Sequence, residues 1–295
     1  MASLTTGENL AIFNSLSFAR TGLVPLTESY MKGAITMEGE EVPVQLTEDG
    51  LIGLVTVPAC GAVSLLPKTV ERKNIVITRN TENGVIMEND IVRVLINHHG
   101  EVVSFVDRST GREFAAGAMN RLLMYKDVPR IFDAWDIDSN YILQPVHLDE
   151  PVNISIRETG GLRAVVHISR KIQNSSFEQE IVLDAGSRRL DFVTTVDWKE
   201  LHRLLKVTFP VNVLVEEGIN EIQFGYLKRP THRSRLYDID RFEVCNQRYS
   251  ALCDESHGAA VLVVLHSLRG ENQTKSSNSM LLVPHGKRCR TRQNP

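Results

Sequence analysis

Short runs of β-branched and apolar residues recur along most of this chain, and nearly all of them end at Gly, Pro, Asn or Asp. In DIVRVLINHHG, residues 90–100, and GLRAVVHISRKI, residues 161–172, apolar side chains alternate with polar ones. A strand with one face on the core requires this period of two, because successive side chains point to opposite faces. Glycines in the turns, Gly100 and Gly186 among them, are placed where a positive φ is expected. The pattern predicts an all-β fold, a large antiparallel β-sandwich of the supersandwich kind preceded by a small β module.

The chain is long enough for more than one folding unit. Its 295 residues exceed the roughly 150 residues expected of one domain. We place a boundary near Leu66-Pro67-Lys68, which gives a small N-terminal β module at residues 1–68 and a β-sandwich domain at residues 69–268. Residues 269–295 are polar, show little apolar periodicity and end in a cluster of cations, so we expect a disordered tail there.

Charge and composition argue against several classes of partner. The chain has 33 Lys and Arg against 36 Asp and Glu, a net charge of −3, with the signs interspersed except at the extreme C-terminus. Nucleic-acid-binding proteins more often have a strongly basic balance, so no nucleic-acid partner is expected. No window approaches the ~18 apolar residues of a membrane span, and the four cysteines form no CxxC pair. We therefore expect a cytoplasmic chain with reduced thiols and no membrane partner.

The stretch EIQFGYLKRPTHRSRLYDIDRFEV has strand-like ends and a polar centre that is unusually rich in cations. Arg229 and Arg233 can grip a carboxylate, a phosphate or sugar hydroxyls as multi-donor forks, with His232 beside them. The alternative is an internal salt-bridge network with neighbouring acids such as Asp238 and Asp240.

A second stretch, PRIFDAWDIDSNY, places carboxylates beside aromatic rings. Asp133, Trp135 and Asp136 can bind a sugar, because an aromatic face stacks on the ring and carboxylates accept hydrogen bonds from its hydroxyls. In a strand, Asp136 and Asp138 would share one face and Asp133 would face the other, so spacing alone defines no pair of general acid and base. The alternative is a polar turn with Trp135 buried beneath it.

Local motifs give no catalytic set. The chain has no G-x-S-x-G pattern, no P-loop and no G-x-G-x-x-G pattern. His147-Leu148-Asp149 is an H-x-D that would place two metal ligands on one side of a strand, but no second pair with ligand spacing follows it. The two histidines before Gly100 are typical of a hairpin turn. These residues predict neither a catalytic residue nor a metal site in this chain.

Five longer segments carry more information than any of these motifs. In chain order they are AIFNSLSFARTGLVPL, MENDIVRVLINHHGEVVSFVDRSTGREF, RIFDAWDID, VDWKELHRLLKVTFPV, and QFGYLKRPTH followed by DIDRFEV. Together they resemble the C-terminal β region of family 38 glycoside hydrolases, the α-mannosidases, in the cytosolic and vacuolar branch. The chain departs from that family at RPTHRSRLYD, where relatives read RPTH-x-N-T-S-W-D, and again after Leu265, where relatives continue with further strands. We therefore expect the sandwich to be incomplete at its C-terminus.

The resemblance implies a retaining, zinc-dependent glycosidase that removes terminal α-D-mannose from oligosaccharides. Enzymes of this family carry the zinc ligands and the Asp nucleophile in an N-terminal α/β domain, and we expect that domain and its zinc to be absent from this chain. The expected partners are a mannose-containing oligosaccharide and the catalytic α/β domain, if it is supplied separately. We expect Arg229 and His232 to contact the sugar, with Asp133, Trp135 and Asp136 as the next candidates.

A second hypothesis comes from a different class of function, a non-catalytic carbohydrate-binding or scaffolding β module that binds sugar without turnover. A zinc and carboxylate set would discriminate the two hypotheses. A third hypothesis is a fragment that does not fold stably, because missing strands leave unpaired sheet edges and an open core.

Overall fold

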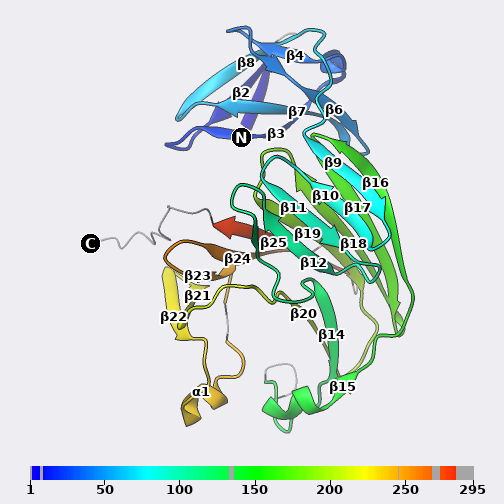
Figure 1. Ribbon diagram of the computed structural model, residues 1–295, viewed down its shortest axis with the longest axis vertical. Helices are drawn as coiled ribbons and strands as arrows, with labels where there is room; N and C mark the ends of the chain where they lie inside the picture. Colours follow the sequence, from blue (N-terminus) through cyan, green and yellow to red (C-terminus); the bar gives the residue numbers. More distant parts are fainter. Residues whose placement is uncertain (1, 7–8, 133–135, 245, 268–272, 284–295) are drawn as a thin grey trace.

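The computed structural model describes residues 2–6, 9–132, 136–244, 246–267 and 273–283. Figure 1 shows a molecule built almost entirely of strands, and every strand pair in the described ranges is antiparallel. This confirms the predicted all-β fold class. The helical elements in these ranges are short: the 3-10 helices η1 (Glu28–Tyr30) and η2 (Ser139–Leu143) and the helix α1 (Leu236–Asp240).

The N-terminal strands form two small sheets around one core. One sheet has the order β1-β2-β8-β4-β5 and the other has the order β3-β7-β6. Tyr30 of η1 is buried between them, and its hydroxyl accepts a hydrogen bond from Leu10 N at 3.0 Å and donates one to Leu65 O at 3.0 Å. The strands are β1 (Ala2–Thr6), β2 (Asn9–Asn14), β3 (Arg20–Leu26), β4 (Ala34–Thr36), β5 (Glu41–Val42), β6 (Val44–Thr47), β7 (Gly50–Val57) and β8 (Gly61–Pro67).

A sheet of 14 strands makes up most of the remaining chain that the structure describes, in the order β13-β12-β11-β10-β9-β16-β17-β18-β19-β25-β24-β23-β21-β22. Its strands are β9 (Val76–Thr81), β10 (Gly84–Glu88), β11 (Val92–Ile96), β12 (Val102–Asp107), β13 (Arg112–Glu113), β16 (Val152–Gly161), β17 (Arg163–Ile172), β18 (Ser175–Asp184), β19 (Arg189–Asp197), β21 (Glu217–Ile222), β22 (Gly225–Pro230), β23 (Tyr249–Cys253), β24 (Gly258–Ser267) and β25 (Gln273–Val283).

Strand β18 shows how the sequence pattern produces this sheet. Phe177, Gln179, Ile181 and Leu183 are buried on one face, while the residues that alternate with them are half-buried or exposed. Burying each large apolar side chain of this kind contributes about 1.5–3 kcal/mol relative to leaving it in water. The same alternation on neighbouring strands gives one continuous core, in which Met87 and Phe105 are fully buried.

A smaller sheet of three strands has the order β15-β14-β20. Its strands are β14 (Arg121–Lys126), β15 (Pro145–Val146) and β20 (Arg203–Thr208). Met124 packs with Ile172 and Phe177 in a separate buried cluster beneath it. In Figure 1, β15 and α1 lie at the end of the molecule that is farthest from the N-terminal sheets.

The C-terminal segment differs from the disordered tail that we expected for residues 269–295. Residues Gln273–Val283 form β25, which lies between β19 and β24 and pairs with both. The polar sequence QTKSSNS lacks the alternation that marks a half-buried strand, so the local pattern could not reveal it. The ladder partners that define β25 come from two separate parts of the chain.

The side chain of Gln45 joins the N-terminal sheets to the large sheet. Its Oε1 accepts hydrogen bonds from Leu162 N at 2.6 Å and Arg163 N at 2.8 Å, and its Nε2 donates to Arg163 O at 3.0 Å. Strand β8 ends at Pro67 and β9 begins at Val76. The division of the chain at residues 1–68 and 69–268 remains our proposal.

Candidate functional site

Strands β21 and β22 form a tight hairpin at one edge of the large sheet. Ile222 pairs with Gly225, so the turn consists of Gln223 and Phe224. Phe224 has a φ of +66°, a conformation that is unfavourable for a bulky residue, and its side chain is fully exposed. The hairpin therefore presents an aromatic ring to solvent at a strained position.

Beyond β22 the chain is held by Thr231. Its backbone N–H donates to Glu216 O at 2.9 Å, and its Oγ1 donates to Val215 O at 2.5 Å. These bonds fix the backbone between Arg229, the penultimate residue of β22, and His232.

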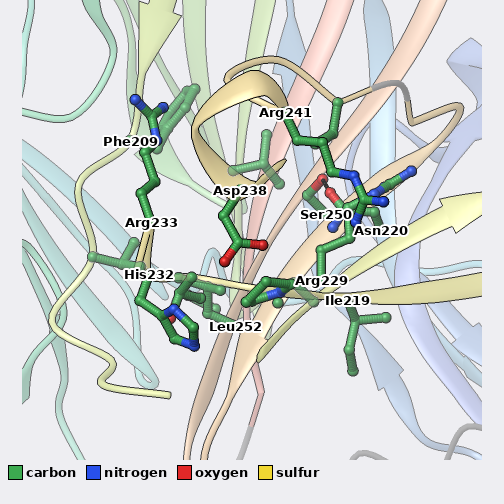
Figure 2. A pocket seen from close by; sticks show the side chains of 18 of the residues that line it. Phe209, Ile219, Asn220, Arg229, His232, Arg233, Asp238, Arg241, Ser250 and Leu252 are labelled. Carbon is green, nitrogen blue, oxygen red and sulfur yellow. Dashed lines mark hydrogen bonds between the residues drawn. The ribbon is translucent and has the colours of Figure 1, made fainter. Parts of the chain in front are cut away.

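A cavity of about 400 Å³ lies between this hairpin, β23, β24 and the segment that contains α1. We call it the hairpin cavity. Its strand-side wall is largely apolar and includes Phe209, Ile219, Ala251, Leu252 and Val261. Its polar side chains are contributed mainly by the rim, where Arg229, His232, Arg233, Asp238 and Arg241 gather (Figure 2). The structure thus brings Arg229 and His232, the two leading sequence candidates, into one cavity.

The basic side chains of the rim are anchored within it. Ser234 Oγ lies 2.7 Å from His232 Nδ1, and Arg233 Nη2 donates to Phe242 O at 3.4 Å. The guanidinium of Arg241 lies 5.3 Å from the ring centroid of Tyr237. His232 and Arg233 are exposed, while Arg229 is half-buried.

Asp238 is the acidic residue of the rim, and it is only 4% exposed. Its Oδ2 accepts a hydrogen bond from Arg235 N at 3.2 Å, whereas its Oδ1 has no hydrogen-bond partner among the described residues. Among the described residues, the hydrogen bond of Asp238 therefore goes to a backbone N–H and not to a guanidinium of the salt-bridge network that is the alternative for this stretch. Buried polar atoms are rarely left without a partner.

Next to the hairpin cavity, the side chains of Tyr141, Lys206 and Glu243 form a hydrogen-bonded cluster. We call these three residues the latch. Tyr141 OH donates to Glu243 Oε1 at 2.6 Å, and Lys206 Nζ donates to Tyr141 OH at 2.7 Å and also to Glu243 Oε1. Phe242 lines the cavity and lies 6.3 Å, centroid to centroid, from the Tyr141 ring. The latch therefore fixes the chain just after α1 against η2 and β20.

Lys206 and Glu243 of the latch stabilise each other's charged form although both are partly buried. Burial disfavours the charged form of each partner, but the hydrogen bonds between them outweigh burial. The pKa of Lys206 is consequently raised above its ordinary 10.5, and the pKa of Glu243 is lowered below its ordinary 4.5. Both groups are charged across the neutral range.

The second predicted stretch is described only in part. Asp133 and Trp135 lie outside the described residues. Asp136 is exposed, does not line the hairpin cavity, and accepts a hydrogen bond from Ile137 N at 2.9 Å. Asp138 is occupied by Arg130, whose Nε lies 3.1 Å from Asp138 Oδ2.

His147 and Asp149 are exposed and line a second, more polar cavity of about 850 Å³ that also includes His98 and His99. In the described part of the chain no three His, Cys, Asp or Glu side chains gather as a metal site requires. The residues that the structure describes thus do not fit the zinc that the family resemblance implies, and we derive no chemical step through a metal.

The sequence marks Asp238 only as a possible salt-bridge partner, and no pattern in it marks Arg241. Both lie in the DIDR segment, where spacing gives no sign that one acid is buried and the next one exposed. Such a signal exists only in the folded chain, because the strands that line the hairpin cavity together with Asp238 come from other parts of the sequence.

Comparison with known proteins shows that this chain contains a C-terminal domain of a glycoside hydrolase. Residues 87–265 match the family described as "Glycosyl hydrolases family 38 C-terminal domain". The chain belongs to this family and contains its C-terminal domain, which confirms the resemblance seen in the sequence.

Several relatives are named α-mannosidases. Alpha-mannosidase 2C1 of Homo sapiens is 36% identical over 221 residues, covering 72% of this chain and 21% of that protein. Alpha-mannosidase G of Dictyostelium discoideum is 31% identical over 239 residues, covering 74% of this chain and 22% of that protein. The chain spans about a fifth of the length of these curated relatives.

A solved structure shares the fold. The crystal structure of an alpha-mannosidase from Enterococcus faecalis V583 matches with a TM-score of 0.65 at 12% sequence identity, covering 94% of this chain and 43% of that chain. In the described residues of our chain, no helix is both long and apolar enough to cross a membrane.

Proposed function

We propose that this chain is the C-terminal part of an α-mannosidase and supports the hydrolysis of terminal α-D-mannose residues in oligosaccharides. The observation that carries the proposal is the match of residues 87–265 to the family 38 C-terminal domain. In this proposal the catalytic carboxylates and the zinc belong to the α/β domain of the family. The present chain serves as the β-rich partner of that domain.

Exposed apolar side chains support a partner domain at the lower end of the molecule in Figure 1. Leu236 of α1 is 83% exposed, and Leu143 of η2 is 76% exposed. Large exposed apolar side chains often mark a protein interface, and we assign Leu143 and Leu236 to contact with the α/β catalytic domain.

The hairpin cavity is the proposed point of contact with the glycan. Arg229 and His232 line it and can donate hydrogen bonds to sugar hydroxyls. Asp133, Trp135 and Asp136 are proposed as further contacts with the glycan. Asp136 precedes η2 in the chain, and the latch joins η2 to the rim of the hairpin cavity.

We place the chain in the cytoplasm within this proposal. The support is the wide spacing of its four cysteines and the free thiol of Cys60, which are usual for a reducing compartment. Cell fractionation with an antibody against the chain tests the assignment, and recovery in a secreted fraction would refute it.

A hydrolysis assay tests the functional proposal. The purified chain, shown by circular dichroism to be folded, is incubated with a chromogenic α-mannoside and zinc, alone and with a separately expressed family 38 α/β domain. We expect no turnover from the chain alone and increased turnover by the α/β domain when the chain is added. Turnover by the chain alone would contradict the assignment of the chemistry to another domain.

The same assay separates the proposal from the second hypothesis of a non-catalytic module. If the chain binds sugar but never changes the turnover of the α/β domain, it is a carbohydrate-binding module and the proposal is wrong. Matched reactions with a chromogenic α-glucoside show whether any increase is specific to mannose.

A further inference from the structure

The carboxylate of Asp238 is an unusual feature of the hairpin cavity. It is 96% removed from solvent, since only 4% of the residue is exposed, yet Oδ1 has no hydrogen-bond partner among the described residues. An unpaired, buried carboxylate oxygen costs free energy, because it has lost water and gained nothing in return. Such an atom in a cavity wall is suited to accept a hydrogen bond from a ligand.

The direction of the side chain agrees with this role. Figure 2 shows the carboxylate pointing into the middle of the hairpin cavity, between Arg233 on one side and Arg229 on the other. Its second oxygen, Oδ2, is tied to the backbone N–H of Arg235, so the side chain is held in place. The free oxygen is therefore positioned by the fold.

The surrounding groups restrict the ligand class. Arginine and histidine side chains on the rim offer N–H donors, whereas Asp238 offers only acceptors when it is ionised. An anionic oxygen of a phosphate or carboxylate would meet repulsion where it touches Asp238 Oδ1, and a cation would meet repulsion from the arginines. A neutral ligand with several hydroxyls can donate to Asp238 and accept from the arginines at the same time.

The strand-side wall of the hairpin cavity suits such a ligand. Ile219, Ala251 and Leu252 provide an apolar surface opposite the polar rim. A sugar ring has C–H groups on its faces and hydroxyls around its edge, so it can match an apolar wall and a polar rim together.

We propose that Asp238 is a ligand-binding residue that accepts a hydroxyl of a neutral sugar in the hairpin cavity, and that it excludes phosphate and carboxylate ligands. The proposal rests on the function proposed above and adds a residue and a specificity to it. Because Oδ1 is closed to water in this structure, side chains of the hairpin cavity have to shift for the ligand to reach it.

Calorimetric titration of the full chain with α-mannobiose, and separately with inorganic phosphate, tests the proposal. We expect binding of the disaccharide and no binding of phosphate. Asp238→Asn should weaken disaccharide binding about tenfold, because one bond to a charged acceptor becomes a weaker one. The variant keeps an oxygen for Arg235 N, so α1 retains that hydrogen bond.

Asp240→Asn is the matched control, since Asp240 lies two residues further along α1 and is exposed. It should leave disaccharide binding unchanged. Circular dichroism of both variants shows that the fold is kept. If Asp238→Asn does not fold, phosphate titration of the natural chain becomes the deciding measurement.

Each result has one meaning. Phosphate binding by the natural chain, equal disaccharide affinity in the natural chain and Asp238→Asn, or no binding of any ligand overturns the inference. If the natural chain and Asp238→Asn bind α-mannobiose equally well, the role of Asp238 is wrong but the proposed function is not contradicted. Binding of a gluco- or galacto-disaccharide in place of α-mannobiose, still dependent on Asp238, keeps the role of Asp238 and overturns the mannose assignment.

Discussion

The hydroxyl of Tyr141 donates a 2.6 Å hydrogen bond to the carboxylate of Glu243, which lies 102 residues further along the chain. Lys206 donates to both of these groups, so three distant segments meet at one point. Phe242, next to Glu243, lines the hairpin cavity. The shape of the cavity therefore depends on a contact that is not part of its own wall.

Tyr141→Phe should loosen the rim of the hairpin cavity. The change keeps the aromatic ring and removes a hydrogen bond to a partly exposed carboxylate, which should lower the free energy of unfolding by about 1 kcal/mol. Urea unfolding measures this loss, and hydrogen exchange should become faster at residues 236–244. Tyr237→Phe on the exposed side of α1 is the control, with a change within about 0.5 kcal/mol. Unchanged exchange at residues 236–244 would show that the latch does not hold the rim.

The latch should stabilise the folded chain only within a defined pH range. The pKa of Glu243 is lowered from 4.5, so its contribution is present above pH 4.5 and is lost as the pH falls through the lower, folded value. The pKa of Lys206 is raised from 10.5, so its contribution is present below pH 10.5 and is lost as the pH rises through the higher, folded value. Unfolding measured against pH should show the advantage of the natural chain over Glu243→Gln between these limits. A constant advantage down to pH values well below 4.5 would argue against the ion pair.

Gln45→Ala should weaken the junction between the N-terminal sheets and the large sheet. It leaves the N–H groups of Leu162 and Arg163 without their acceptor, a loss that we expect to cost about 2 kcal/mol in unfolding free energy. Urea unfolding is the measurement, and Gln223→Ala in the exposed hairpin turn is the control. Equal stability of the two variants would mean that the Gln45 contacts are not important for the junction.

Gly160→Ala should be strongly destabilising. Gly160 has a φ of +118°, and an added Cβ would lie 2.2 Å from Val76 O, where β16 and β9 pair. The added methyl group either clashes with Val76 O or shifts the pairing of β16 with β9. We expect the free energy of unfolding to fall by about 3 kcal/mol. Gly186→Ala is a matched control, because Gly186 has a φ of +67° and open space around it, so only the backbone term of about 1 kcal/mol applies. Thermal unfolding distinguishes the two, and similar losses would contradict the steric argument.

Alternation of side chains made the strands predictable, as in β18, where every second residue is buried. The position of β25 between β19 and β24 was not predictable, because pairing between distant strands depends on the whole sheet and the sequence of β25 is mostly polar. Local pattern describes one strand and its two faces, but not its neighbours.

The candidate site likewise contains residues that the sequence predicts and residues that it does not. Arg229 and His232 stand out in the sequence because cations cluster there, and the structure brings both to the hairpin cavity. The burial of Asp238 and the contact between Tyr141 and Glu243 depend on segments far apart in the chain, so no local pattern marks them.

Sugar binding by the hairpin cavity is the first property to measure. The folded chain is titrated calorimetrically with α-mannobiose, beside an Arg229→Ala variant whose circular dichroism matches that of the natural chain. We expect saturable binding by the natural chain and about tenfold weaker binding by the variant, since one charged donor is lost. No binding by the natural chain, or equal binding by both, would contradict this expectation.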